Sequence, residues 1–241
     1  MTMILLIAAV PLETTLLRQE ISAARTLSCG STEIISGQLS GHQILLAHGG
    51  IGQTNMAMQL TRLLLEHTPQ AVMLCGCGGA YPGSGLKVGD LALATAEIFG
   101  DTGVETSSGF IPFEQLNIPQ DARLTPPLQQ TLPLDPKLLQ LAQNCLPSTR
   151  SGSFVTVNCC SGQEQLSRNL HQRTGGICEN MEGAAAARVC AEFGCPLLEV
   201  RGISNPTGTH DKAHWDLPLG ARIAQEAILN LFHQTATGQW P

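Results

Sequence analysis

Short apolar runs and segments of helical periodicity alternate along the whole chain. The apolar run at 3–10 predicts a buried strand, and residues 12–24 that follow predict an amphipathic helix. Parallel strands need crossover connections, which are usually helices that cover the faces of the sheet. The alternation therefore predicts a single α/β domain over residues 1–241, with a mixed, mostly parallel central sheet flanked by helices.

The remaining elements follow from the same periodicities and from turn residues. Strands are expected at 32–39, 42–48, 71–75, 90–99, 152–157, 176–179 and 196–204, and helices at 53–67, 137–146, 163–172, 181–193 and 219–234. The helix over 181–193 has a clear stop signal in Gly194 and Pro196. Six of the 14 prolines lie between Pro112 and Pro136. Because proline lacks a backbone donor and fixes φ, we expect a lid or surface connection at about 107–136.

Composition excludes several classes of function. The formal net charge is −6, whereas a nucleic-acid-binding surface would be basic. No apolar run reaches the roughly 18 residues of a membrane span, and the first residues read as a strand rather than a signal peptide. The nine cysteines lack the spacing of a disulfide framework, which favours free thiols in a reducing cytoplasm. We therefore expect a cytoplasmic protein with neither nucleic-acid nor membrane partners.

No metal or other cofactor is expected. Cys75 with Cys77, and Cys159 with Cys160, lack the spacing of a zinc site. A second candidate is the segment 210–216, in which two histidines and two aspartates alternate: His210, Asp211, His214 and Asp216. The prolines and glycine around this segment predict a loop rather than a metal-binding helix, so the four side chains are interpreted either as loop residues close to a ligand or as ordinary polar residues of the surface.

Residues that carry chemistry follow the predicted strands. Glu13 comes after the first strand, Gly76–Gly79 after the strand at 71–75, Asn158 after 152–157 and Asn205 after 196–204. Ligands of open α/β sheets bind beyond the carboxyl ends of the strands. Glu182, where a helix begins, is the fifth feature. Their common position predicts one binding crevice.

Two carboxylates in this set have specific chemical interpretations. Glu182 can accept two hydrogen bonds from a ribose diol, with Met181 against the apolar face of the sugar; alternatively, it only complements the helix dipole. Glu13 lies in an apolar, hydroxyl-bearing turn, which predicts a raised pKa suited to general acid–base catalysis; alternatively, it is a solvated carboxylate. Glu199 and Arg201 lie two apart on one strand face and are interpreted as a structural ion pair.

The glycines allow a close approach of backbone to a ligand. Gly78 and Gly79 can bring main-chain atoms against a bound molecule, or they simply form a tight turn. The segment 49–52, GGIG, precedes a helix and can present amides to an anion or a hydroxyl, with a structural turn as the equal alternative. The run at 76–79 lacks the lysine and the spacing of a P-loop, which argues against a nucleoside triphosphate.

The chain resembles the purine nucleoside phosphorylase and methylthioadenosine nucleosidase superfamily over essentially its full length. The matching segments are VPLETTLLR, GGIGQTNMA (49–57), CGCGGAYPGSGLKVGDL (75–91), FVTVNCCSG (154–162), NMEGAAAA and RGISN. Within the superfamily it is most similar to the futalosine hydrolase family. That similarity rests on FGDTGVE (99–105), FVTVNCCSG and RGISNPTGTHDKAHWDL (201–217).

The resemblance implies hydrolysis of the N-ribosidic bond of a purine nucleoside, without a cofactor and in a homo-oligomer. Glu13 matches the glutamate that activates water, Glu182 the residue that holds the ribose hydroxyls, and Met181 the methionine packed on the sugar. Asn205 stands where adenosine-type nucleosidases have the aspartate that helps to protonate adenine. The further substrate contacts that we carry over are Ile51, Gly78, Gly79, Asn158 and Cys160.

Asn205 favours hypoxanthine over adenine as the leaving base. Hypoxanthine presents two acceptors on its outer edge, N7 and O6, which an amide can donate to and an ionised aspartate would repel. An asparagine can also pair with the edge of adenine, but it cannot serve as a proton-donating acid. Three alternatives remain open: an adenine nucleosidase acting on methylthioadenosine or aminofutalosine, a purine nucleoside phosphorylase, and a non-catalytic nucleoside-binding protein.

Overall fold

The structure is a computed structural model that describes residues 3–30, 32–118 and 129–236. Its strands are β1 Met3–Ala8, β2 Ser22–Cys29, β3 Thr32–Leu39, β4 His42–His48, β5 Ala71–Ala80, β6 Leu91–Phe99, β7 Gly103–Thr106, β8 Gly109–Pro112, β9 Thr131–Pro133, β10 Arg150–Thr156, β11 Cys178–Asn180 and β12 Leu197–Pro206. The α-helices are α1 Thr15–Glu20, α2 Gln53–Glu66, α3 Pro136–Cys145, α4 Glu164–Thr174, α5 Gly183–Phe193 and α6 Leu217–Thr235. Three short 3-10 helices are η1 Pro11–Thr14, η2 Phe113–Leu116 and η3 Lys212–His214.

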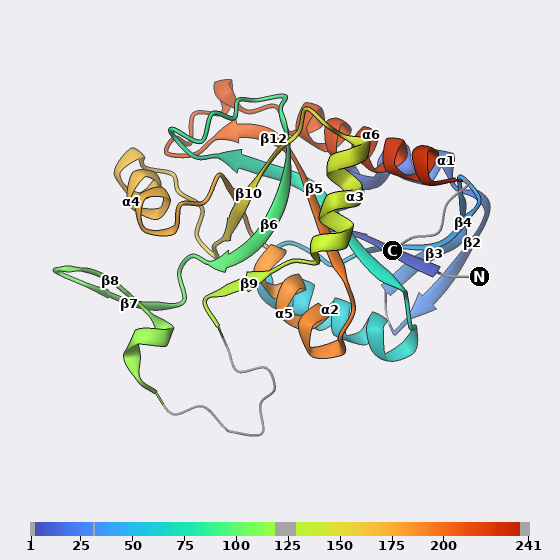
Figure 1. Ribbon diagram of the computed structural model, residues 1–241, viewed down its shortest axis with the longest axis horizontal. Coiled ribbons are helices and arrows are strands. Elements are labelled where there is room, and N and C mark those ends of the chain that lie inside the picture. Colours follow the sequence, from blue (N-terminus) through green and yellow to red (C-terminus); the bar gives the residue numbers. More distant parts are fainter. Residues whose placement is uncertain (1–2, 31, 119–128, 237–241) are drawn as a thin grey trace.

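The central sheet is mixed and partly closed on itself. Its strands follow the order β11-β10-β6-β12-β5-β1-β4-β3-β2, and β11 pairs again with β5. Strands β5, β12, β6, β10 and β11 thus form a barrel-like ring, from which β1, β4, β3 and β2 extend (Figure 1). The expected α/β fold is present. The pairings of this sheet that the structure describes divide evenly between parallel and antiparallel, because the β2–β4 meander and the ring closures are antiparallel, so the expectation of a mostly parallel sheet is corrected.

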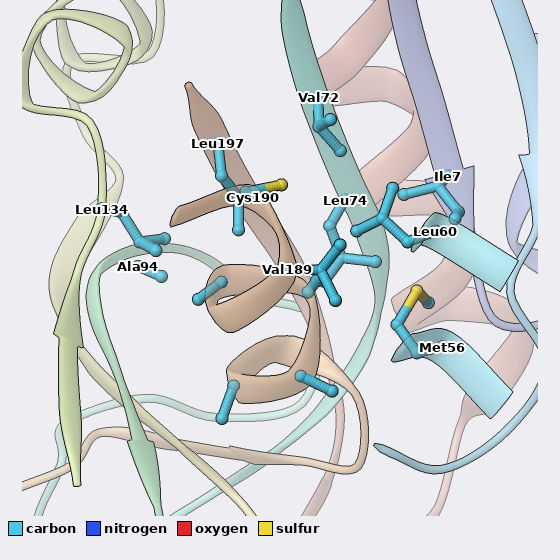
Figure 2. Close-up of a cluster of buried hydrophobic side chains, with 14 of the residues drawn as sticks. Ile7, Met56, Leu60, Val72, Leu74, Ala94, Leu134, Val189, Cys190 and Leu197 are labelled. Atoms are coloured by element: carbon cyan, nitrogen blue, oxygen red, sulfur yellow. The ribbon is translucent and has the colours of Figure 1, made fainter. Parts of the chain in front are cut away.

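Helices cover the sheet from both sides, as predicted. Helices α2 and α5 pack on one face, and α1, α3 and α6 lie on the other (Figure 1). Each face has its own buried apolar cluster. In the first cluster, Val189 and Cys190 of α5 gather with Met56 and Leu60 of α2 and with Leu74 of β5 (Figure 2). The four alanines that follow Gly183 in the first turns of α5 are all buried, and their small side chains let the amino end of the helix lie close to the sheet.

The prediction of one helix over 12–24 is wrong. The segment forms η1 and α1, which end at Glu20, and the chain then enters β2. Ile21 turns extended and packs on Gly37 of β3, where an added Cβ would overlap the Ile21 side chain. The apolar spacing fits a helix, but strand pairing of β2 with β3 determines the outcome. β2 is almost entirely exposed, so its sequence lacks the alternation of apolar and polar residues from which a strand is predicted.

The glycine run after 71–75 also differs from the expectation. Instead of a turn, Gly76, Gly78 and Gly79 continue β5 as far as Ala80. This happens because β12 runs parallel to β5 over the same stretch and supplies its hydrogen bonds. The ligand-facing edge therefore lies along the last residues of the strand, not beyond them.

The proline-rich segment has short elements rather than a long one. Residues 103–112 form the β7–β8 hairpin, η2 follows, and β9 pairs with β6. The hairpin extends away from the sheet next to α4 (Figure 1), where Arg173 lies over the Phe110 ring at 3.8 Å from its centroid. Residues 119–128 of the expected lid lie outside the described residues. None of the helices described is long and apolar enough to cross a bilayer.

Candidate active site

A cavity of about 350 Å³ opens at the ends of β1, β5, β11 and β12. Eight of the nine predicted site residues line it: Glu13, Ile51, Gly78, Gly79, Cys160, Met181, Glu182 and Asn205. The structure does not bring Asn158 to this cavity. That residue is exposed, and its backbone N–H donates to Asp101 Oδ2 at 2.6 Å. The crevice inferred from strand ends thus assembles the two carboxylates and the amide that the sequence singled out.

Glu13 is buried in η1 and held by three backbone amides. Its Oε2 accepts from the N–H groups of Ala9 (3.0 Å) and Val10 (3.2 Å), and its Oε1 accepts from Cys77 N–H at 2.8 Å. A carboxylate oxygen accepts about two hydrogen bonds. Oε2 is therefore saturated, whereas Oε1 keeps one acceptor position. The carboxylate has a fixed orientation and one oxygen free for a further donor.

The glycine at position 76 makes room for this carboxylate. An added Cβ there would lie 2.6 Å from Glu13 Oε1 and 2.9 Å from Arg201 Nη1. Both distances are shorter than van der Waals contact, so a side chain at Gly76 would displace one of the two charged groups. The glycine run therefore serves the site by admitting neighbouring side chains into its wall.

The pKa of Glu13 is raised. Burial is the main cause, because it removes water from the charged form, and the negative charge of Glu182 adds to it. The Arg201 guanidinium and the amides of Cys77 and Val10 act in the opposite direction. The sequence predicted this direction from the apolar turn around Glu13, and the structure agrees. Such a carboxylate is a stronger base than an exposed one.

Glu182 lies at the N-cap of α5, one position before the first helical turn in which it was expected. Its side chain does not cap its own helix. Instead, Oε1 accepts from the N–H of Gly52, where α2 begins, at 2.9 Å, and Oε2 lies 3.5 Å from Arg201 Nη1. Each oxygen keeps an acceptor position. The GGIG turn thus presents an amide to an anion, and that anion is the side chain of Glu182.

Asn180 performs the capping that Glu182 does not. Its Oδ1 accepts from the N–H groups of Glu182 (2.9 Å) and Gly183 (2.7 Å). Its Nδ2 donates to Glu97 Oε1 at 2.7 Å. Asn180 was not predicted as a site residue, although the asparagine two positions before Glu182 is a recognisable N-terminal signal for a helix.

Asn205 lies in β12 beside Gly79. Its Oδ1 accepts from Ser204 Oγ at 2.8 Å, and its Nδ2 donates to the carbonyl of Pro206 at 3.1 Å. One N–H of the amide is left for a ligand, because Nδ2 carries two. The register of β12 shifts next to this residue, between Ile203 and Asn205, where the strand follows β5. The side chain is thereby held in the cavity wall with one donor available.

Arg201 contacts two of the buried carboxylates, Glu199 and Glu182. Its Nε donates to Glu199 Oε1 at 2.8 Å, which confirms the predicted ion pair. Its Nη1 reaches the carbonyl of Cys77 at 3.1 Å and Glu182 Oε2 at 3.5 Å. The carboxylates around it raise the pKa of Arg201 further, so the guanidinium is permanently charged. The sequence predicted the pair but not that Arg201 lines the cavity.

A further buried carboxylate, Glu179, fixes the loop after β10. It accepts from the backbone N–H of Ser161 at 2.9 Å, from Ser161 Oγ, and from the Tyr81 hydroxyl at 2.8 Å. All three residues are buried. Cys160 and Gly162, which line the cavity, are thereby held on either side of an anchored residue.

The segment 209–217 forms the remaining wall. His210 and Trp215 line the cavity, with their rings in an edge contact at 5.8 Å. Asp211 and Asp216 act as helix caps, accepting from the N–H groups of Ala213 (3.0 Å) and Leu219 (2.9 Å). Residues 209–216 form a loop with one short 3-10 helix, as the prolines and glycine around them predicted, and α6 begins at Leu217. It adds an aromatic surface to the cavity.

Comparison with known proteins gives a consistent result. The family model described as the phosphorylase superfamily matches residues 3–235. The futalosine hydrolase of Thermus thermophilus is 33% identical over 204 residues, which are 84% of this chain and 87% of that protein. A solved structure of a futalosine hydrolase mutant of Helicobacter pylori strain 26695 has a TM-score of 0.84 at 20% identity, covering 97% of this chain and 100% of the other. The methylthioadenosine/S-adenosylhomocysteine nucleosidase of Neisseria meningitidis, in complex with methylthio-immucillin-A, has a TM-score of 0.83 at 20% identity, with 97% and 100% covered.

Proposed function

This chain belongs to the phosphorylase superfamily, and from that membership we propose that it is an N-glycosyl hydrolase that cleaves the N-ribosidic bond of futalosine. The products are hypoxanthine and dehypoxanthine futalosine, in the futalosine route to menaquinone. The observation that carries the proposal is Glu13, a buried carboxylate with a raised pKa and one free acceptor position in the cavity. The 33% identity to the futalosine hydrolase of Thermus thermophilus supports the choice of substrate.

Hydrolysis begins at Glu13. The free position on Oε1 accepts a hydrogen bond from water, and the carboxylate takes the proton as the water oxygen adds to the anomeric carbon. The departing base leaves a ribosyl group with oxocarbenium character, without a covalent enzyme intermediate. Water arrives on the side opposite the leaving group, as in an inverting glycosidase. The raised pKa suits this role, since it makes the ionised carboxylate a better base.

Glu182 and Met181 hold the sugar. The two oxygens of Glu182 each keep one acceptor position, which matches the two donors of a vicinal ribose diol. Met181 offers an apolar surface to the ring. Because Gly52 and Arg201 fix the carboxylate before a ligand binds, little ordering is needed when the diol is gripped.

Asn205 contacts the leaving purine. The remaining N–H of its amide donates to the N7/O6 edge of hypoxanthine, stabilising the negative charge that a 6-oxopurine spreads onto its oxygen. An adenine leaving group gains more from an acid at this position, and asparagine is not one. The adenine nucleosidase alternative is therefore disfavoured by this single side chain.

The cavity is a poor phosphate site, which favours water over phosphorolysis. Among the described residues that line it, Arg201 is the only lysine or arginine. Its Nε and Nη1 donors are engaged by Glu199, Glu182 and the Cys77 carbonyl, and its Nη2 lies 3.5 Å from Asn180 Oδ1. A phosphate dianion would instead meet the carboxylates of Glu13 and Glu182, which repel it.

The protein acts as a homo-oligomer in the cytoplasm in this proposal. Ile51, Met58 and Leu65 are 57%, 56% and 72% exposed. Met58 and Leu65, seven residues apart, lie on one side of α2, and Ile51 lies in the turn that precedes the helix. Ile51 also lines the cavity. An apolar stripe of this kind, beginning at the rim of the cavity, is suited to a second copy of the chain. The nine cysteines, all free, support a reducing compartment.

Incubation with candidate nucleosides tests the reaction. Futalosine, inosine, aminofutalosine and methylthioadenosine are supplied with and without inorganic phosphate, and the released base is measured by chromatography. We expect hypoxanthine from futalosine at the same rate in both conditions. Release that requires phosphate would replace hydrolysis by phosphorolysis, and faster release of adenine would establish the nucleosidase alternative.

Replacement of Glu13 tests the base. In Glu13→Gln the side chain keeps its shape but cannot take a proton, so we expect kcat to fall by about 10²–10⁴-fold while futalosine still binds. In the unchanged enzyme, kcat/KM should rise with pH through the pKa of Glu13, at a midpoint above the ordinary value of 4.5. Stopped assays over a pH series and calorimetric binding measure both. A Gln variant with full turnover would refute the role of Glu13.

Replacement of Asn205 tests the recognition of the base. Asn205→Asp removes the donor and places a negative charge opposite the two acceptors of hypoxanthine. We expect kcat/KM for futalosine to fall at least tenfold, which corresponds to about 1.4 kcal/mol of transition-state stabilisation, and the ratio of adenine to hypoxanthine release to rise. Asn158→Asp, at an exposed asparagine outside the cavity, is the matched control. Unchanged futalosine activity in Asn205→Asp would refute the proposed contact.

Light scattering tests the assembly. We expect a mass that is a multiple of the 25.5 kDa chain, and a shift towards the single-chain mass in Met58→Lys, because a charge in the stripe opposes apolar contact. Glu226→Lys changes an exposed residue of α6 and should leave the mass unaltered. A single-chain mass at micromolar concentration would contradict the proposal.

A further inference from the structure

Two fully buried glutamates lie behind the cavity, and the proposed reaction makes no use of them. Glu97 of β6 and Glu199 of β12 are both without exposed surface. They meet beneath Gly183, the first residue of α5. An added Cβ at Gly183 would overlap Glu97 Oε1 and lie 2.6 Å from Glu199 Oε2. The two oxygens therefore border the same small space.

One carboxylate oxygen of this pair has no hydrogen-bond donor among the described residues. Glu97 accepts from Thr156 Oγ1 at 2.6 Å and from Asn180 Nδ2 at 2.7 Å. Glu199 Oε1 accepts from Arg201 Nε, but its Oε2 is fully buried and has no hydrogen-bond partner in the described part of the chain. An unsatisfied carboxylate oxygen is costly in the interior. A proton on Glu97 Oε1 would supply the missing donor.

The charge of the surroundings leads to the same conclusion. Among the residues that the structure describes, Arg201 is the one cation that faces the pair, and Glu13 and Glu182 lie on its other side. The thiols of Cys75, Cys77 and Cys178 also face the cluster, and burial raises the pKa of each, so they stay neutral. Four ionised carboxylates against one guanidinium would bury a large excess of negative charge. Burial, followed by the charge of Glu199, raises the pKa of Glu97 well above its ordinary value.

We propose that Glu97 and Glu199 share one proton at the pH of activity, so that the pair carries a single negative charge, and that this charge, held on Arg201, keeps Glu13 a strong base. Glu97 and Glu199 are positioning residues, since neither lines the cavity. The second half of the inference rests on the proposed function, in which Glu13 is the base.

The link to Glu13 runs through the guanidinium. Glu199 is the nearest carboxylate to Arg201 at 2.8 Å, while Glu182 is at 3.5 Å. Arg201 is also the strongest influence that lowers the pKa of Glu13. If the buried pair lost its charge, the positive charge of Arg201 would be less compensated and would act more strongly on Glu13. The pKa of Glu13 would then fall, and its carboxylate would be a weaker base.

The pH profile of kcat/KM for futalosine tests this coupling. Glu97→Gln keeps the charge of the pair at −1, because glutamine replaces a neutral acid. We expect the rise of kcat/KM with pH, here called the ascending limb, to keep the midpoint that it has in the unchanged enzyme. Glu97→Gln combined with Glu199→Gln brings the charge to zero, and we expect the limb to move to lower pH by on the order of one unit. Glu226→Gln, at an exposed glutamate of α6, should not move it.

Each variant has an outcome that overturns part of the proposal. A limb that moves to lower pH in Glu97→Gln alone means that Glu97 is ionised in the native enzyme. A limb that stays in place in the double variant means that the pair does not act on Glu13. A purely structural role would lower Tm in these variants without moving the limb, so Tm is measured alongside.

A spectroscopic readout is independent of catalysis. In the Glu13→Gln protein at neutral pH, infrared difference spectra should show the carbonyl stretch of one buried protonated carboxyl group, and adding Glu97→Gln should remove it. Absence of this band refutes the shared proton even if the multiple variants fail to fold. Presence of the band in Glu13→Gln, together with no cleavage of futalosine by the unchanged protein, would refute the proposed function and leave the shared proton standing.

Discussion

Arg201 is the only buried cationic side chain in the described part of the chain, and the arrangement of the site depends on it. It bonds Glu199 on its own strand, reaches Glu182 at the amino end of α5, and acts on Glu13 from β12. A single guanidinium thus attracts carboxylates from three separate segments of the chain. Removing one partner of a buried pair typically costs about 3–5 kcal/mol, since the remaining charge stays without compensation. The same group therefore contributes to folding and sets the electrostatics of the cavity.

The elements and the position of the site were largely predictable from sequence. Apolar periodicity located β1, α2 and α5, and strand ends located Glu13, Glu182 and Asn205, because these signals are local. The strand β2 was missed because its side chains are exposed on both faces. The continuation of β5 through its glycines was missed because the pairing that stabilises it comes from β12, more than a hundred residues away.

The electrostatic detail of the site was not predictable, for a related reason. The sequence shows that Glu13 lies in an apolar turn, which was enough to predict the direction of its pKa shift. It does not show that Glu97 approaches Glu199, or that Gly52 donates to Glu182. These contacts join residues far apart in the chain, and their geometry follows from the packing of α5 over the sheet. Asn158 illustrates the opposite case, since a residue that follows a strand end donates to Asp101 and does not line the cavity.

The pairing of β11 with β5 closes a ring of five strands, and this has a consequence for how the enzyme would lose activity. β11 is hydrogen-bonded along both edges, to β10 and to β5, and Glu182 follows it by two residues. β11 therefore has no free edge from which to fray, and releasing this strand from the ring requires both rows of hydrogen bonds to break. Hydrogen exchange of these amides then reports global unfolding, and thermal inactivation coincides with loss of the fold instead of preceding it.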